Sequence, residues 1–174
     1  MKKSSPLLHI ATAASVLTLL VGCQGDGSKG SGDAGSGQAP NVLATTGMVA
    51  DLAREIAADA APVEALMASG VDPHLYKARE SDVRRLADAD LVFMNGLHLE
   101  AKMGQVLRKI GRSRPVVAIA ETLPEDRLIV VDEASGAHDP HVWFDVSLWA
   151  DTIPAVTDAL AEQIPEQAAG IRER

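Results

Sequence analysis

Two short segments, residues 90–95, which are apolar from 91 to 94, and residues 115–120, which are apolar throughout, constrain the fold of this chain more than any other feature. Gly96 follows the first segment and Pro115 begins the second, and between them residues 99–110 have apolar positions at helical spacing. Strands that are apolar at every position are typical of a parallel sheet with helices on both faces. The sequence therefore predicts an α/β fold.

The same alternation begins earlier in the chain. Residues 42–45 and 62–68 are further short apolar segments, and helical spacing follows the first of them, with Thr46 as the expected N-cap. Strands that alternate with helices imply a parallel sheet with right-handed crossover connections. Because ligands bind beyond the carboxyl ends of such strands, Gly47 and residues 95–96 are expected to border a pocket.

The sequence also predicts which side chains face the core. Ser81 is expected to cap a helix with one apolar face. The expected inward residues of this helix are Val83, Leu86 and Ala87, and the expected outward residues are Asp82, Arg84 and Arg85. Three aromatic residues are also expected in the core, namely Trp143, Phe144 and Trp149.

The last third of the chain is expected to contain an additional edge strand at residues 127–131 and then a polar loop at 132–139. Apolar residues from 148–164 recur at helical spacing, and Pro154 should bend that helix or mark its boundary. Pro165 stands in the expected first turn of a further helix, which reaches the last residue without a cap or a packing partner.

The first residues have the pattern of an exported lipoprotein. Residues 1–22 begin with a positive charge and continue through an uncharged, mostly apolar segment of the length of a secretory signal. The small residues before Cys23 resemble a lipobox, in which the cysteine becomes the lipidated first residue of the mature chain. A plain signal peptide with an incidental cysteine is the alternative. Residues 23–40 are then expected to form a flexible tether, and residues 41–164 are expected to form a folded lobe.

Composition narrows the ligands and partners of that lobe. The chain has 174 residues and a net charge of −8, which predicts an ordinary globular domain and argues against a nucleic-acid partner. Its single cysteine is the one expected to be lipidated, so no thiol remains for a disulfide or a zinc-thiolate site. A bound metal would therefore need imidazole and carboxylate ligands.

The tripeptide Asp-Pro-His occurs twice and ends at His74 and His141. In each copy the proline fixes its own φ and disfavours helix at the preceding aspartate, so the histidine stands on a stiff backbone. Asp72 and Asp139 are expected to form turns rather than to bind metal. The repeat favours His74 and His141 as two ligands of one site for Zn, Mn, Fe or Co, whereas a single loop histidine is more often a surface residue.

Three further residues are candidates for the rim of the pocket: Thr46, His98 and Glu100. His98 lies near a helix start, so it either begins that helix or borders the pocket. Glu100 is expected to cap the helix start or to support a ligand from outside the coordination shell. His138 is expected to be solvated, with adventitious metal binding as the alternative.

Four segments in order, residues 45–51, 70–76, 95–100 and 139–145, resemble the metal-specific solute-binding lipoproteins of bacterial ABC transporters, the TroA-like, PsaA-like and ZnuA-like proteins. The sequence Asn-Gly-Leu-His-Leu-Glu in the third segment and the lack of a His-rich loop before His141 look more TroA-like than ZnuA-like. The resemblance implies a parallel four-stranded sheet flanked by helices. It also implies that this is the amino-terminal lobe of a two-lobed protein whose lobes are joined by one long helix.

The resemblance also implies a function. In that family the amino-terminal lobe supplies two histidine ligands, which fall on His74 and His141, and the second lobe supplies a Glu or His and then an Asp. Residues 165–174 look like the start of the connecting helix, with the second lobe missing, so weak and quickly exchanging metal binding is expected. The implied role is capture of Mn²⁺ or Zn²⁺, with Fe²⁺ as a further candidate, by a lipid-anchored receptor of an ABC permease in the cell envelope.

Two other classes of function stay open at this point. A metallohydrolase would need an open coordination position, but the sequence has no His-Glu-x-x-His motif and no visible activated nucleophile. The prediction is therefore that the chain is not an enzyme. A degenerate or adhesion-type surface lipoprotein of the same fold, with little metal binding, is the second alternative.

Overall fold

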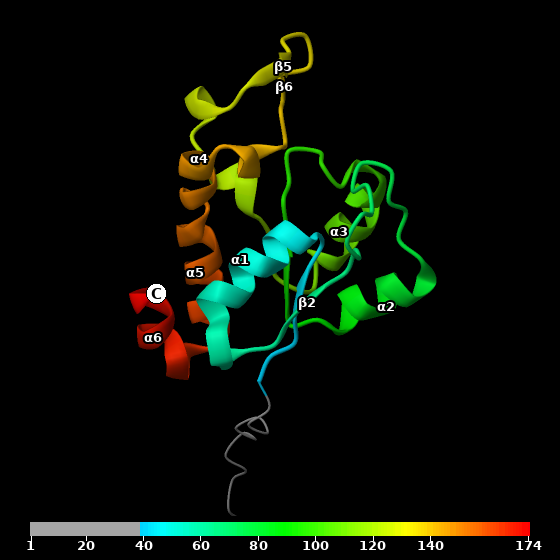
Figure 1. The fold of residues 1–174 in the computed structure, drawn as a ribbon. Coiled ribbons are helices and arrows are strands. Elements are labelled where there is room, and N and C mark those ends of the chain that lie inside the picture. Colours follow the sequence, from blue (N-terminus) through cyan, green and yellow to red (C-terminus); the bar gives the residue numbers. More distant parts are fainter. Residues whose placement is uncertain (1–38) are drawn as a thin grey trace, which may run out of the picture. The chain divides into compact units, whose positions relative to one another are not determined.

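The computed structural model describes residues 39–174, whose fold is drawn in Figure 1. The expected signal peptide, the expected lipidation site at Cys23 and nearly all of the expected tether lie outside these residues. Within residues 39–174, no helix is both long enough and apolar enough to cross a membrane.

One four-stranded sheet organises the fold, and every pair of neighbouring strands in it is parallel. The strand order across the sheet is β2-β1-β3-β4. The strands are β1 (Val42–Ala44), β2 (Val63–Ala65), β3 (Leu91–Met94) and β4 (Val116–Ala118). The prediction of a parallel α/β sheet is therefore confirmed, with each strand somewhat shorter than the apolar segment that predicted it.

Helices cover both faces of this sheet. Helices α1 and α5 lie on one face, and α2 and α3 lie on the other (Figure 1). The α-helices of the described part of the chain are α1 (Gly47–Ala57), α2 (Glu80–Asp88), α3 (Gly104–Ile110), α4 (Val146–Ala150), α5 (Ile153–Gln163) and α6 (Ala168–Glu173). Short 3-10 helices occur at Ala58–Ala60, Ala101–Met103, Ile119–Thr122, Glu125–Arg127, Val142–Phe144 and Pro165–Gln167.

Successive residues of the two central strands enter opposite clusters of the core. Val42, Ala44 and Phe93 pack with α1, α5 and α6, whereas Leu43 and Val92 pack with α2 and α3. None of these side chains is more than 2% exposed. A strand that is covered on both faces is apolar at every position, which explains the apolar segments in the sequence.

Helix α2 begins differently from the prediction. Its first residue is Glu80, so Ser81 lies inside the helix and does not cap it. Asp82 points inward, because its Oδ2 accepts hydrogen bonds from Tyr76 OH and Arg79 N, each at 2.7 Å. Burial raises the pKa of Asp82, but the hydrogen bonds from Arg79 and Tyr76 outweigh burial, so this pKa lies below its ordinary value.

Because the carboxylate of Asp82 points inward, the side of α2 that faces the core differs from the predicted side. Leu86 is buried, as predicted. Val83 and Ala87 are exposed, so the predictions for these two residues and for Asp82 are wrong. Helical spacing alone cannot reveal that a hydrogen-bonded aspartate occupies a place on the inward face.

The segment before His141 also departs from the prediction. Strand β5 (Val130–Asp132) pairs antiparallel with β6 (Ala137–His138) in a separate hairpin, so residues 127–131 are not an edge strand of the main sheet. This hairpin extends away from the body of the lobe (Figure 1). Strand β4 is one of the two edge strands of the main sheet. Its residues are half-buried, although the prediction was a fully buried strand. Phe144 is 80% exposed and therefore does not belong to the core.

The last helices confirm one prediction and correct another. Pro154 lies in the first turn of α5, so it marks a helix boundary, as predicted. Helix α6, however, has a packing partner: it packs against α5, and Ile171 is buried in the core cluster. Arg174 Nη1 also donates hydrogen bonds to the carbonyl oxygens of Ile56 and Ala57, at 3.0 and 3.3 Å. These carbonyls end α1, so the guanidinium caps that helix.

Candidate metal site

A buried carboxylate joins the carboxyl ends of the two central strands. The chain runs outward from β1 to β2 and then crosses to β3, so the crevice between β1 and β3 is the switch point of the sheet. Glu100 lies there and accepts hydrogen bonds from Thr45 Oγ1 at 2.6 Å, from Asn95 N at 2.8 Å and from Gly96 N at 3.2 Å. Because Glu100 is 1% exposed, its carboxylate lies below the pocket rim and links the two strand ends.

The turn between β3 and Glu100 has an unusual backbone. Gly96, Leu97 and His98 have φ angles of 85°, 50° and 65°. A Cβ atom at Gly96 would lie 2.9 Å from Glu121 Cγ, so only glycine fits this close approach. Left-handed backbone at the two following residues costs free energy, which the hydrogen bonds to Glu100 offset.

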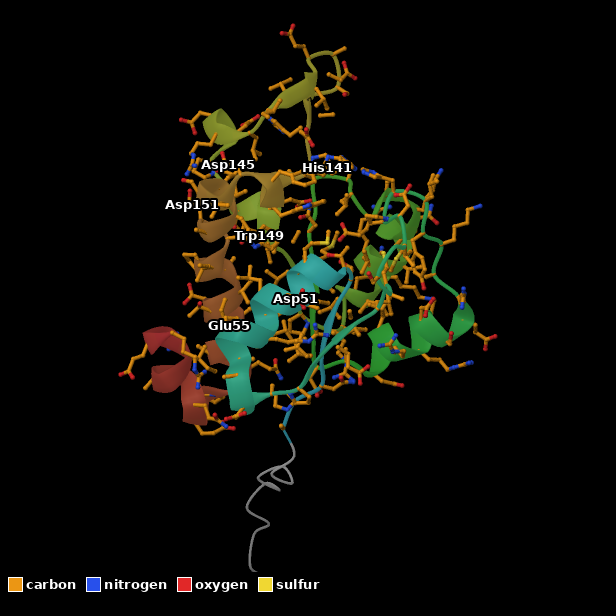
Figure 2. The ribbon with its side chains drawn as sticks, viewed as in Figure 1. Asp51, Glu55, His141, Asp145, Trp149 and Asp151 are labelled. Carbon is orange, nitrogen blue, oxygen red and sulfur yellow. The ribbon has the colours of Figure 1, made fainter. Side chains whose placement is uncertain are left out.

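The two Asp-Pro-His segments meet near this edge of the sheet. His74 follows β2 and His141 follows the hairpin, and their Nε2 atoms lie 3.1 Å apart. Figure 2 shows His141 at the end of the lobe from which the hairpin extends. Two imidazole nitrogens bound to one tetrahedral zinc ion would lie about 3.3 Å apart, given zinc–nitrogen distances of about 2.0–2.1 Å. The pair therefore has the spacing of two ligands of one metal ion.

Both aspartates of the repeat form turns, as predicted. Asp72 Oδ1 accepts a hydrogen bond from His74 N at 2.9 Å, and Asp139 Oδ1 accepts one from His141 N at 3.0 Å. Only Asp139 also contacts its histidine ring, with Oδ1 2.5 Å from His141 Nδ1. A proton on Nδ1 makes this contact a hydrogen bond and leaves the lone pair of Nε2 directed at His74.

The charge state of Asp139 agrees with this role. The backbone N–H of His141, followed by its ring N–H, holds the pKa of Asp139 below its ordinary value, against the smaller opposing effect of burial. The carboxylate is therefore ionised under neutral conditions and accepts both hydrogen bonds. It contacts Nδ1 of His141, not the Nε2 atom that faces His74, and so orients one of the two rings.

The other candidate residues lie elsewhere. Thr46 caps α1 through a hydrogen bond from Val49 N, as predicted, and lines a hollow of about 680 Å³ together with Pro73. His98 is exposed and lines a different hollow of about 460 Å³. His138 is not solvated as expected, because its side chain is only 12% exposed on strand β6, with Nε2 4.0 Å from Glu125 Oε1.

Within residues 39–174, the histidine pair stands without further candidate ligands. In the part of the chain that the structure describes, no third His, Cys, Asp or Glu joins the pair to make a set of three ligands. The side chains beside the pair are apolar and outward-facing: Leu75 is 68% exposed and Phe144 is 80% exposed. The ring of Trp143 stands edge-on to the His141 ring, with centroids 5.2 Å apart. This arrangement can hold a metal ion from one side.

Asn95 also makes a contact near the site that the sequence does not indicate. Its Nδ2 donates hydrogen bonds to Gly96 O at 3.1 Å and to Pro140 O at 3.0 Å, and Pro140 directly precedes His141. The sequence places residues 95–96 at the pocket edge. The contact with Pro140 depends on the tertiary structure, because no spacing pattern relates the two positions.

Comparison with known proteins finds relatives that are named for zinc or manganese binding. Residues 42–174 match the family described as ZnuA, zinc-uptake complex component A, periplasmic. The chain is 45% identical over 135 residues to the Zinc-binding protein TroA of Treponema pallidum, an alignment that covers 78% of this chain and 43% of that protein. It is 40% identical over 154 residues to the Manganese-binding lipoprotein MntA of Bacillus subtilis, which covers 88% of this chain and 49% of that protein.

The structural comparison agrees. The solved structure of the periplasmic zinc binding protein TroA from Treponema pallidum matches with a TM-score of 0.74 and 44% sequence identity, over 78% of this chain and 48% of that one. The chain spans about half the length of the curated relatives that it matches.

Proposed function

Since this chain belongs to the ZnuA family of periplasmic zinc-uptake components, we propose that it captures Zn²⁺ or Mn²⁺ outside the cytoplasmic membrane for import by an ABC permease. The family consists of metal-binding transport components and not of enzymes. The observation that carries the proposal is the pair of Nε2 atoms of His74 and His141, 3.1 Å apart beside the carboxyl edge of a parallel sheet.

We propose that His74 and His141 donate two neutral imidazole nitrogens to the transported ion. The structure supports this assignment because Asp139 fixes the His141 ring with Nε2 toward His74. The function is coordination and release, so affinity and exchange rate are its relevant quantities. Imidazole ligands prefer Zn²⁺ to Mn²⁺ or Fe²⁺ on affinity alone, so the cognate metal depends on geometry and supply. The relatives include proteins named for zinc and for manganese.

We further propose that a lipid on Cys23 keeps the lobe in the cell envelope, next to the permease. The sequence before Cys23 has the lipobox pattern, and one relative is named as a lipoprotein. A tether from Cys23 to residue 40 would leave the lobe free to reorient while it stays close to the membrane. The metal could then pass directly to the permease.

The proposal predicts that Zn²⁺ and Mn²⁺ stabilise the folded chain. A ligand that binds only the native state raises the free energy of unfolding by about 2.7 kcal/mol at a free concentration 100 times its Kd. The measurement is the thermal midpoint, followed by circular dichroism over a series of metal concentrations. Because two ligands hold the ion from one side, we expect the midpoint to rise gradually and at high metal concentrations. Mg²⁺, which prefers oxygen ligands, is the control and should not shift the midpoint. An absence of any shift with Zn²⁺ and Mn²⁺, or an equal shift with Mg²⁺, would contradict the proposal.

The two copies of Asp-Pro-His provide a matched pair of variants. Asp139→Ala removes the hydrogen bonds to both the backbone and the ring of His141, whereas Asp72→Ala removes only the bond to the backbone of His74. We expect Asp139→Ala to weaken Zn²⁺ binding by about 10–100-fold, the usual effect of losing a partner that orients a ligand, and Asp72→Ala to have a smaller effect. Titration with a competing zinc indicator measures both. Equal losses in the two variants would show that ring orientation by Asp139 is unimportant.

A further inference from the structure

We infer that Asn95 is a positioning residue of the metal site, because its carboxamide fixes the backbone that carries His141. This inference deepens the proposed function and rests on it for its metal-binding readout. It concerns the distance between His74 Nε2 and His141 Nε2, which the Asp-Pro-His motifs do not determine by themselves. The two motifs stiffen their own turns, but their separation depends on how each turn is attached to the sheet.

Asn95 is attached to the lobe through every polar group of its backbone. Its N–H donates to Glu100 Oε1 at 2.8 Å, and its carbonyl accepts from Ala120 N, after β4, at 2.9 Å. The residue is 0% exposed. Because the backbone of Asn95 is held in this way, its side-chain carboxamide starts from a fixed position relative to β3 and β4. The carboxamide can therefore anchor a neighbouring loop.

The anchored loop is the one that carries His141. Asn95 Nδ2 donates to Pro140 O at 3.0 Å. In the described part of the chain, residues 139–141 receive no other hydrogen bond from the segments that follow β1 and β3. The hairpin before this loop extends away from the body, so it offers little support on that side (Figure 1). Asp139 N donates to Ile129 O at 2.8 Å, which ties the loop to the segment just before the hairpin strand β5. The carboxamide is therefore the polar link between the His141 loop and the end of β3.

The burial of Asn95 has a cost, which indicates that its donor group matters. Its Oδ1 is buried and is the one buried side-chain oxygen or nitrogen among the described residues without a hydrogen-bond partner. An unpartnered buried carbonyl oxygen costs free energy, and an apolar residue would avoid that cost. Two acceptors, Gly96 O and Pro140 O, face Nδ2, which fixes the orientation of the amide. The Asn95 side chain thus keeps the hydrogen bond from Nδ2 to Pro140 O, although Oδ1 of the same amide has no partner.

Small movements of this loop would change metal binding. Ligand distances in metal sites vary by only about 0.2 Å, so a shift of Pro140 that moves the His141 ring by more than this removes one ligand from its position. A residue that acts through His141 in this way should affect the arrangement of the two rings even without metal. That effect separates a positioning role from a contribution to stability alone.

The test compares Asn95→Asp with Asn41→Asp in the full chain. The first change keeps the shape of the side chain but removes the donor and sets a carboxylate against two carbonyl oxygens. Asn41 is exposed and directly precedes β1, at the opposite end of the sheet. The same chemical change at Asn41 therefore serves as the control. Asn95→Ala is the second variant if Asn95→Asp does not fold. The first readout is the nuclear Overhauser effect between the ring protons of His74 and His141 without metal. The second is Co²⁺ binding, followed by visible absorption.

We expect Asn95→Asp or Asn95→Ala to lose the ring-to-ring effect and to bind Co²⁺ about 10–100-fold more weakly, while Asn41→Asp matches the unchanged chain. Retention of the effect together with Co²⁺ affinity within twofold would overturn the inference. If the unchanged chain shows the effect but binds no Co²⁺, the proposed function fails, and loss of the effect in the Asn95 variants still supports the positioning role. Absence of the effect in the unchanged chain would overturn the geometry on which both proposals rest.

Discussion

Replacement of both His74 and His141 by alanine should abolish metal-dependent stabilisation of this chain. Their Nε2 atoms are the pair proposed to bind the ion, and no third ligand joins them within residues 39–174. The expected loss of Zn²⁺ affinity therefore exceeds the roughly 10–100-fold that follows from loss of a partner outside the coordination shell. Each single variant should also lose most of the metal-induced shift in thermal midpoint, because only one of the two imidazole ligands remains. The measurement is the thermal midpoint with saturating Zn²⁺ and without metal.

The control for these variants is His98→Ala together with His138→Ala. His98 lines a separate hollow, and His138 lies on strand β6 near Glu125. We expect these two changes to leave the Zn²⁺-induced shift intact. Because His74 and His141 are only half-buried, their removal should also change the metal-free midpoint little. A Zn²⁺-induced shift that survives in the His74/His141 double variant would place the binding site elsewhere and refute the proposed ligands.

The largest expected effect on stability comes from Glu100→Ala. The substitution removes the acceptor of three buried donors: the Thr45 hydroxyl and the backbone N–H groups of Asn95 and Gly96. Each buried donor without a partner costs about 1–3 kcal/mol, so the free energy of unfolding should fall by at least about 3 kcal/mol. Glu100→Gln keeps one carbonyl oxygen and should lie between the unchanged chain and the alanine variant. Urea denaturation measures these differences, and the slope m of the unfolding free energy against urea concentration should be compared among the variants.

Glu55 provides the matched control. It lies on α1, where Figure 2 labels it, and it is exposed. Glu55→Ala and Glu55→Gln should each change the free energy of unfolding by less than about 0.5 kcal/mol, as is usual for surface positions. If the Glu100 variants are no less stable than the Glu55 variants, the buried carboxylate does not hold the ends of β1 and β3 together.

The family resemblance read from four short segments agrees with the family match over residues 42–174. These segments can indicate the family because each contains positions at which the fold requires a particular kind of residue. At Gly96 the positive φ and the close approach of Glu121 admit only glycine. At Thr46 a side-chain acceptor is needed to cap α1. Requirements of this kind act over a few neighbouring residues and can therefore be recognised in sequence.

The errors in prediction have a common origin. Asp82 is buried because Tyr76 and Arg79 supply donors, although an aspartate at a helical position predicts an outward side chain. Phe144 is exposed beside the histidine pair, although its apolar ring predicts burial. In both cases the exposure of the side chain depends on its specific surroundings, which hydrophobic spacing does not report. Hydrophobic spacing reports an average preference, and specific partners override it.

The sequence by itself determined the parallel α/β sheet, the strand edge at which a ligand would bind, and His74 and His141 as the two candidate ligands. These follow from hydrophobic period, from backbone restrictions at Pro and Gly, and from a repeated tripeptide, all of which are local. Only the tertiary structure decided that the two Nε2 atoms face each other at 3.1 Å, that Glu100 accepts a hydrogen bond from Thr45, and that Asn95 donates one to Pro140. Those contacts join residues that are distant in the chain, and a hydrogen bond exists only where the folded backbone brings donor and acceptor within about 3 Å.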